Sequence, residues 1–195
     1  MFLKHLIAPL VLNLGTGPLP YMNQDLIRGG FKVVASDISL AMIRESSKTF
    51  SHKHLSFIIA DNRNLPFDDN FFDSILAINS ILPERREDVD RMLRESYRVL
   101  KKSGRFVGFF PAWETSLKTR ECFGAIETLD EENFRVFETT GWQCYQTEET
   151  LYNHLKNAGF LKIMIKRVLL KSKAEIRSMK RIYNIDTRKC LMFEH

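Results

Sequence analysis

Residues 12–21 read LNLGTGPLPY, and the interpretation of the whole chain starts from this stretch. An apolar run, Leu10–Leu14, leads directly into Gly15 and Gly17. Two glycines after a strand let the backbone turn sharply and let its N–H and C=O groups approach a ligand closely. Where such loops often have a third glycine, this chain has Leu19 between two prolines. We therefore expect a ligand-binding loop with an apolar continuation.

The composition is that of one globular domain. The chain has 195 residues, of which 44% are hydrophobic, so it can bury a substantial core. No apolar run approaches the ~20 residues that a membrane span needs. The three cysteines, Cys122, Cys144 and Cys190, are far apart and form no CxxC pair, which disfavours disulfides and zinc and favours a cytoplasmic location. We expect a single domain over residues 1–195, with no bound metal.

Short apolar runs alternate with longer amphipathic stretches along the chain. The predicted strands cover residues 10–14, 31–36, 55–60, 72–79, 105–110, 160–169 and 189–193, and the predicted helices cover residues 22–28, 40–49, 88–100, 147–158 and 172–183. Ser39 and Thr147 are expected N-caps, and Gly104 is the expected left-handed cap of the third helix. The alternation indicates a parallel sheet with helices on both faces and an antiparallel strand at one edge.

Two segments depart from this rhythm. Residues 112–146 form a longer connection rich in aromatic residues, which is either a lid over a flat or apolar small molecule or part of the packing of the helical layer. Residues 162–189 contain ten lysines and arginines but only two acidic residues. This basic segment is interpreted as a solvated helix face and a lysine-protected strand edge, with a surface for RNA, an anionic membrane or an acidic substrate as the alternative.

Polar residues follow the predicted strands at the points where ligands bind in a doubly wound sheet. Asp37 follows the second strand, Asp61 and Asn62 follow the third, and Asn79 follows the fourth. A carboxylate at Asp37 can accept hydrogen bonds from both hydroxyls of a ribose. Asp61 can accept from the exocyclic amine of adenine, while the backbone amide near Asn62 can donate to a ring nitrogen. Together with the glycines, these residues predict an adenosine site.

With these elements in order, nearly the whole chain resembles a class I S-adenosylmethionine-dependent methyltransferase. The resemblance is carried by VLNLGTG, VVASDISLAMI, IIADNRNLPFDDNFFDSILAINSI, MLRESYRVLKKSGRFVGF and TEETLYNHLKNAGFLKIMI. The block ADNRNLPFDDNFFD is the most specific of these, because dinucleotide dehydrogenases do not usually carry it. The resemblance implies an α/β fold, a single-domain doubly wound Rossmann-like sheet of seven strands in the order 3-2-1-4-5-7-6, with strand 7 antiparallel and helices on both faces.

The resemblance also implies S-adenosyl-L-methionine as cofactor and S-adenosyl-L-homocysteine as product. It implies that Gly15 and Gly17 flank the methionine part and that Asn79 lies near the sulfonium and the substrate. The ribose and adenine contacts fall on Asp37, Asp61 and Asn62. The full expected cofactor set is Asn13, Gly15, Thr16, Gly17, Asp37, Ile38, Asp61, Asn62 and Asn79, and the expected substrate contacts are Tyr21, Trp113 and Trp142.

The chain departs from the family pattern in three places. The acid that usually opens the first motif is Asn13, and the third glycine is Leu19. The sequence from Gly15 to Tyr21 is nevertheless similar to a G-S-G-P-T-x-Y variant found in small-amine N-methyltransferases. Only about ten residues precede the core of the first strand, where many relatives have a helical extension over the substrate. We expect a more open pocket, or one closed by residues 112–146, a second copy or a partner chain.

The favoured function is methyl transfer to a small-molecule acceptor by in-line displacement. No general base is assigned, because the five histidines fall outside the strand-end residues. Asn79 is followed by Ser-Ile-Leu, which is not the Pro-Pro-aromatic sequence typical of enzymes that methylate exocyclic amines of bases. The alternatives are a non-catalytic methyltransferase-like binding or regulatory domain, favoured by Asn13 and Leu19, an RNA methyltransferase that uses the basic segment, and an NAD-dependent Rossmann enzyme, which leaves the block around Asp61 unexplained.

Overall fold

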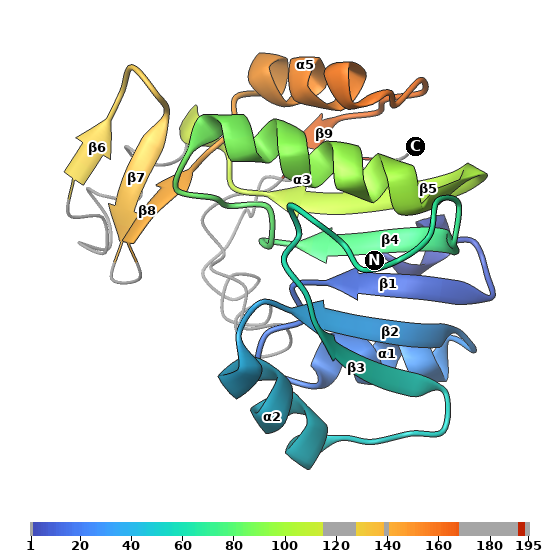
Figure 1. Ribbon diagram of the computed structural model, residues 1–195. Helices are drawn as coiled ribbons and strands as arrows, with labels where there is room; N and C mark the ends of the chain where they lie inside the picture. Colours follow the sequence, from blue (N-terminus) through green and yellow to red (C-terminus); the bar gives the residue numbers. More distant parts are fainter. Residues whose placement is uncertain (1, 115–127, 139–140, 168–190, 194–195) are drawn as a thin grey trace.

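The computed structural model describes residues 2–114, 128–138, 141–167 and 191–193, and its main element is a mixed sheet (Figure 1). Within these residues the sheet has seven strands: β1 (Leu10–Leu14), β2 (Lys32–Asp37), β3 (Leu55–Ile59), β4 (Phe72–Ile78), β5 (Leu100–Phe110), β9 (Lys166–Arg167) and β10 (Leu191–Phe193). Their order is β3-β2-β1-β4-β5-β10-β9. Strands β1 to β5 pair in parallel, while β10 runs antiparallel to β5 and β9. The predicted α/β class with a mostly parallel sheet is confirmed.

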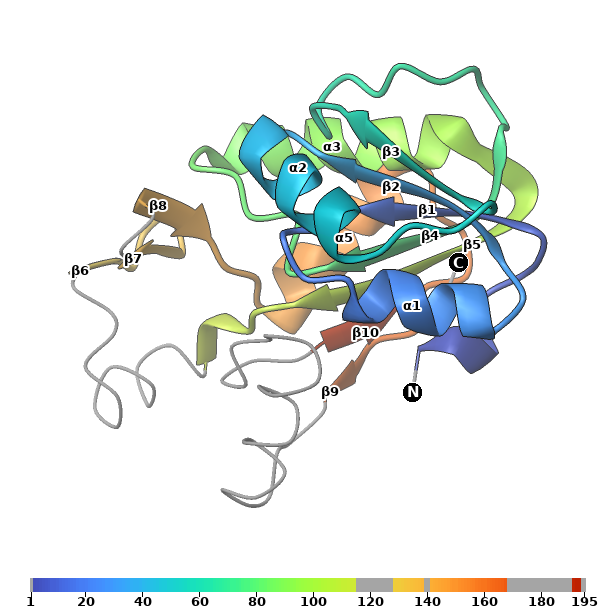
Figure 2. The same ribbon diagram turned by 90° about the horizontal axis from the view of Figure 1, so that it is seen from below.

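Helices lie on both faces of this sheet. The described helices are η1 (Leu3–His5), α1 (Tyr21–Arg28), α2 (Leu40–Thr49), α3 (Arg86–Val99) and α5 (Glu148–Ala158). Helices α3 and α5 cover one face, and α1 with the N-terminal residues covers the other (Figure 2). Val89, Leu93 and Val99 are fully buried at helical spacing, so α3 presents one apolar stripe to the sheet. Helix α2 packs against β2 and β3.

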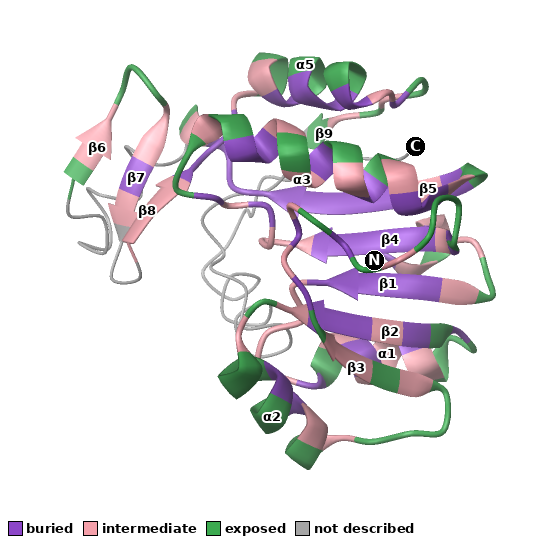
Figure 3. Cartoon of the chain, viewed as in Figure 1, coloured by how far each residue is buried: buried purple, intermediate pink, exposed green. Residues whose placement is uncertain are grey.

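Each face of the central strands is buried in its own apolar core (Figure 3). On β1, Leu12 points into the core under α3 and α5, and Val11 points into the core under α1. This alternation follows from the two-residue period of a strand, and it explains why the central strands are nearly continuous apolar runs. Phe2 is 2% exposed and packs edge-on against Phe109, so the N-terminal residues belong to the second core.

A second sheet stands at the edge of the fold, in the segment predicted only as an aromatic connection (Figure 1). Its antiparallel strands are β6 (Thr128–Asp130), β7 (Arg135–Glu138) and β8 (Gly141–Cys144). The indole of Trp113 packs on the ring of Phe134 at 5.4 Å. The rings of Phe137 and Trp142 pack against each other, and the guanidinium of Arg86, the first residue of α3, lies over Phe134. These aromatic residues therefore pack around the small sheet, beside the start of α3.

Three local expectations were wrong or fall partly outside the described residues. The chain passes from α3 into β5 at Leu100 with extended geometry, and Gly104 lies inside β5 without a positive φ, so it is not a helix cap. Of the strand predicted over residues 160–169, only Lys166–Arg167 is a strand within the described part. The helix predicted over residues 172–183 lies outside the described residues. The N-caps are confirmed, since Ser39 and Thr147 each accept a hydrogen bond from a backbone N–H three residues on.

Candidate functional site

The carboxyl ends of β1, β2 and β4 meet at one edge of the sheet. Leu14 at the end of β1 is aligned with Ser36 on β2 and with Ala77 on β4. Two cavities, of about 380 and about 210 Å³, open at this edge. All nine cofactor residues expected from the sequence line one or the other, and Gly15, Gly17 and Asn79 line both. The two cavities are therefore adjoining compartments that share the glycine loop and Asn79 as part of their lining.

The two glycines of the loop are needed for different reasons. Gly15 has φ +68°, and a Cβ built on it would lie 2.3 Å from the Cβ of Ser80. Gly17 has φ +64°, but a Cβ there would meet nothing within 4 Å. Positive φ favours glycine at both positions. Only Gly15 is also required by a close neighbour, whereas Gly17 leaves open space beside the cavities.

A network of uncharged side chains holds the loop to α1. The Nδ2 of Asn13 donates to the Oδ1 of Asn23 at 2.8 Å and to the Oγ1 of Thr16 at 3.0 Å. The Nδ2 of Asn23 also donates to Thr16 Oγ1, at 2.8 Å, and the backbone N–H of Thr16 donates to Ser36 O. Asn13 and Asn23 are buried. Asn13, which stands where the family usually has an acid, is thus a structural anchor of the loop as well as a wall of the smaller cavity.

Asp37 joins the ends of β1 and β2 through its carboxylate. Its Oδ2 accepts from the backbone N–H of Gly17 at 2.9 Å, and its Oδ1 accepts from the N–H of Ser39 at 3.0 Å. A carboxylate offers about four acceptor positions, so two hydrogen bonds leave capacity on both oxygens for a ligand. The half-buried Asp37 side chain lines the larger cavity beside Ile38, which is 63% exposed.

Asp61 and Asn62 form the far wall of the larger cavity. The Asp61 carboxylate is paired with Arg63, and these hydrogen bonds hold the pKa of Asp61 below its usual value despite partial burial. Asn62 is nearly buried, and its Nδ2 donates to Ser80 O at 3.1 Å, which ties the end of β3 to the end of β4. The larger cavity is therefore lined by two carboxylates, Asp37 and Asp61.

Two buried polar atoms at the junction of the compartments have no hydrogen-bond partner. They are Oδ1 of Asn79 and Oγ of Ser80. The backbone of Asn79 has φ +49°, and its N–H donates to Phe109 O. A buried acceptor or hydroxyl without a partner is costly. Among the residues with such atoms, Asn79 and Ser80 line the cavities, whereas Ser36, Ser46 and His154 do not.

The expected substrate residues lie in different places. Tyr21 lines the smaller cavity and is 41% exposed. Neither Trp113 nor Trp142 lines either compartment, because Trp142 packs against Phe137 and under the guanidinium of Arg135. The neighbour of Trp142 on β8, Gln143, lines the larger cavity instead. Successive side chains of a strand point to opposite faces, so Trp142 and Gln143 lie on different faces of β8. No sequence signal identified Gln143 beforehand.

The remaining chemistry-bearing side chains do not form a second centre in the described part of the chain. No group of three or more His, Cys, Asp and Glu residues there is placed to hold a metal ion. His154 contacts Asp90 at 2.8 Å between α5 and α3, away from both cavities. Among the helices of the described residues, none has the length and apolarity that crossing a membrane requires.

The model of the methyltransferase domain family matches residues 12–108, which span the glycine loop, Asp37, Asp61 and Asn79. The chain belongs to the class I S-adenosylmethionine-dependent methyltransferases. A curated relative in Francisella tularensis, the ubiquinone/menaquinone biosynthesis C-methyltransferase UbiE, is 27% identical over 161 residues, which are 75% of this chain. The chain spans 63% of the length of that methyltransferase.

Solved methyltransferase structures share the fold. A methyltransferase from Methanosarcina mazei superimposes with a TM-score of 0.69 at 18% identity, covering 98% of this chain and 92% of its own. The 1,6-didemethyltoxoflavin N1-methyltransferase of Burkholderia thailandensis, solved with S-adenosylhomocysteine, gives a TM-score of 0.64 at 14% identity, covering 95% and 68%. At these identities the likeness shows the fold of this methyltransferase domain alone.

The residues present fit the family's cofactor. Its ribose has two hydroxyl donors for Asp37, and its adenine has an amine donor for Asp61. Asn79, with its unpartnered Oδ1, lines both compartments, and Ser80, with its unpartnered Oγ, lines the larger one. Asn13 and Leu19, the two departures from the family pattern, both line the smaller compartment.

Proposed function

We propose that this chain is an S-adenosylmethionine-dependent methyltransferase that transfers a methyl group to a small-molecule acceptor. The observation that carries the proposal is the pair of joined cavities, with the carboxylates in the larger one and the unpartnered Asn79 and Ser80 atoms at the junction. Ribose and adenine are assigned to the larger compartment, beside Asp37 and Asp61. The methionine part is assigned to the smaller compartment, beside Asn13 and Thr16.

The proposed chemistry asks little of the protein beyond alignment and exclusion of water. The cofactor supplies a methyl group already activated on a sulfonium. The loop of Gly15 and Gly17 fixes the depth of binding, and Asn79 at the junction orients the reacting end. Positioning of this kind lowers the barrier by removing translational and rotational freedom before reaction. Tyr21 and Ile78, which line the smaller compartment, form a wall on the acceptor side.

The acceptor is proposed to be a flat or apolar small molecule. The described lining of the smaller compartment, which includes Leu19, Tyr21, Met22 and Ile78, contains no charged residue. Because the Francisella relative is named for ubiquinone and menaquinone biosynthesis, reduced quinone precursors belong in the first acceptor panel, beside small aromatic amines. The RNA alternative rests on a basic segment that lies mostly outside the described residues.

Calorimetry with S-adenosylmethionine and S-adenosylhomocysteine tests the proposal first. We expect both to bind, and Asp37→Ala to weaken binding by about tenfold or more, because it removes charge-assisted hydrogen bonds. The control is Asp25→Ala, which removes a carboxylate on α1 that is paired with Arg28 and lines neither cavity. A folded protein that binds neither ligand would refute the proposal.

The non-catalytic alternative makes a different prediction. A binding or regulatory domain retains ligand affinity but transfers no methyl group to any acceptor. Transfer of radiolabelled methyl from S-adenosylmethionine to the acceptor panel, and to mixed RNA at low salt, separates the three functions. A labelled small molecule supports the proposal. Labelled RNA instead indicates an RNA methyltransferase that uses the basic segment. Binding without transfer to any acceptor in the panel favours the regulatory domain.

A further inference from the structure

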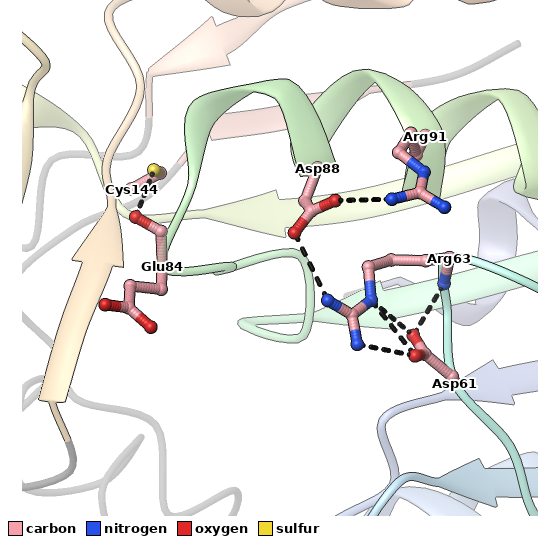
Figure 4. Close-up of polar contacts among 6 residues, drawn as sticks. All are labelled: Asp61, Arg63, Glu84, Asp88, Arg91 and Cys144. Carbon is pink, nitrogen blue, oxygen red and sulfur yellow. Dashed lines mark hydrogen bonds and ion pairs between the residues drawn. The ribbon is translucent and has the colours of Figure 1, made fainter.

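Arg63 holds the Asp61 carboxylate through its guanidinium and its backbone N–H (Figure 4). Asp61 lines the larger cavity, whereas Arg63 does not. The Nε of Arg63 lies 3.0 Å from Oδ1 of Asp61, its Nη2 lies 2.7 Å from Oδ2, and its backbone N–H donates to Oδ1 at 2.9 Å. The other end of the guanidinium donates from Nη1 to Oδ2 of Asp88 at 3.2 Å. Only Asn62 separates the two partners in the chain, so this forked contact closes a tight local loop.

The link to Asp88 fixes this pair to α3. Asp88 lies in the first turn of the helix, its side chain is 9% exposed, and its Oδ1 also accepts from Arg91 Nη1 at 3.3 Å. A buried carboxylate that accepts from two guanidinium groups has little freedom to move. The orientation of Asp61 is therefore tied to α3 through Arg63 and Asp88.

The hydrogen bonds from Arg63 leave one acceptor position free on the Asp61 carboxylate. A carboxylate has about four lone-pair positions. Oδ1 is used by the backbone N–H and by Nε of Arg63, while Oδ2 accepts from Nη2 and shares Nε at 3.0 Å. Since Asp61 also lines the larger cavity, the free capacity of Oδ2 is available to one N–H of a ligand there.

We propose that Arg63 is a positioning residue for the nucleobase, which holds Asp61 as a fixed, acceptor-only group and so makes the site select a 6-aminopurine over a 6-oxopurine. The proposal rests on the proposed function, since it concerns the same cofactor. A 6-amino group donates to the held oxygen. A 6-oxo group presents an acceptor to an acceptor, and a site built around a hydrogen bond rejects an analogue that cannot form it.

The charges around Asp61 support this role. The groups that face it are Arg63 on its own turn, Asp88, Glu87 and Arg91 on α3, Glu84 and Arg85 before α3, and Asp37 across the larger cavity. The Arg63 hydrogen bond is the largest cause of the lowered pKa of Asp61, and Arg91 adds to it. Without Arg63, the largest cause that lowers the pKa of Asp61 is gone while burial still raises it, so the ionised form is lost at a higher pH.

The test compares wild type with Arg63→Gln, Arg63→Lys and the control Arg28→Gln, which removes an exposed guanidinium paired with Asp25 away from the site. Affinities for S-adenosylhomocysteine and S-inosylhomocysteine are measured by calorimetry at about pH 7.5 and about pH 5. We expect Arg63→Gln to weaken binding of the adenine ligand about tenfold, to reduce its preference over the inosine ligand, and to lose further affinity at the lower pH. Arg63→Lys keeps a positive charge but cannot make the forked, two-nitrogen contact with Asp61, so its affinity for the adenine ligand should lie between those of wild type and Arg63→Gln.

Circular dichroism establishes that each variant is folded. If Arg63→Gln does not fold, Asp88→Asn replaces it, and we expect a smaller loss of affinity for the adenine ligand in the same direction. Unchanged affinity, preference and pH response in Arg63→Gln would overturn the proposal while leaving the proposed function intact. Tighter binding in that variant would also overturn it, because Arg63 would then compete with the ligand for Asp61. Failure of wild type to bind S-adenosylhomocysteine is the separate result that removes both.

Discussion

Replacing Gly15 by alanine is expected to destabilise the fold through two separable effects. The residue has φ +68°, and a side chain in this left-handed region costs about 1 to 2 kcal/mol. The new Cβ would also lie 2.3 Å from Ser80 Cβ, a distance that real Cβ atoms do not adopt, so the ends of β1 and β4 must separate. Overpacking of this kind costs about 1 to 3 kcal/mol more.

Gly17→Ala is the matched control, because Gly17 has φ +64° but no atom within 4 Å of a built Cβ. Urea unfolding followed by circular dichroism should give a loss of about 2 to 5 kcal/mol for Gly15→Ala and about 1 to 2 kcal/mol for Gly17→Ala. Adding Ser80→Gly to the Gly15→Ala chain should recover the packing part, measured against Ser80→Gly alone in a double-mutant cycle. Equal losses for the two glycine variants, or no coupling with Ser80, would refute the reasoning.

Three further predictions concern stability and reactivity. Thr147→Ala should cost about 1 kcal/mol in urea unfolding, because it removes the capping box of α5, whereas Thr49→Ala at the exposed end of α2 serves as a control with a smaller effect. The hydrogen bond from Arg98 lowers the pKa of Glu95 from its usual 4.5, so the pair stabilises the fold above that pH and this contribution is lost as the pH falls. Between about pH 6 and about pH 4, the free energy of unfolding of Glu95→Gln should therefore fall less than that of wild type, and equal losses would contradict this. Burial raises the pKa of Cys144 to about 11, so in a chain whose other cysteines are serine, alkylation at neutral pH should be at least about tenfold slower when the protein is folded than in urea.

The parts of the structure that could be predicted from sequence are those with local signals. The strands β1 and β4 are short apolar runs, and Ser39 and Thr147 begin helices through their own side chains, so neighbouring residues suffice to place them. The strand-end residues Asp37, Asp61 and Asn79 follow from the strands, because a parallel sheet brings its carboxyl ends to one edge.

The parts that could not be predicted depend on long-range contacts. Lys101 to Gly104 looks like a helix end, but β5 already begins at Leu100, where Phe72 on β4 pairs with it. The strands of the small sheet have only three or four residues, too few for the two-residue alternation of side chains to be recognised. Their aromatic residues therefore did not show which face of each strand they would occupy. For that reason Trp142 was expected at the site and Gln143 was not, although the two residues differ only in the face of β8 that carries them.

The Asn13, Asn23 and Thr16 network has a consequence for how the site responds to acidity. Amide and hydroxyl side chains do not change charge between acid and neutral conditions, so the attachment of the glycine loop to α1 is insensitive to pH. Where an acid opened this loop, its protonation would have altered the loop and the ligand contacts together. In this chain the contact between the glycine loop and α1 carries no titratable group, and acidity acts instead on the opposite wall of the larger cavity, at Asp61, whose pKa is set by its hydrogen bonds with Arg63.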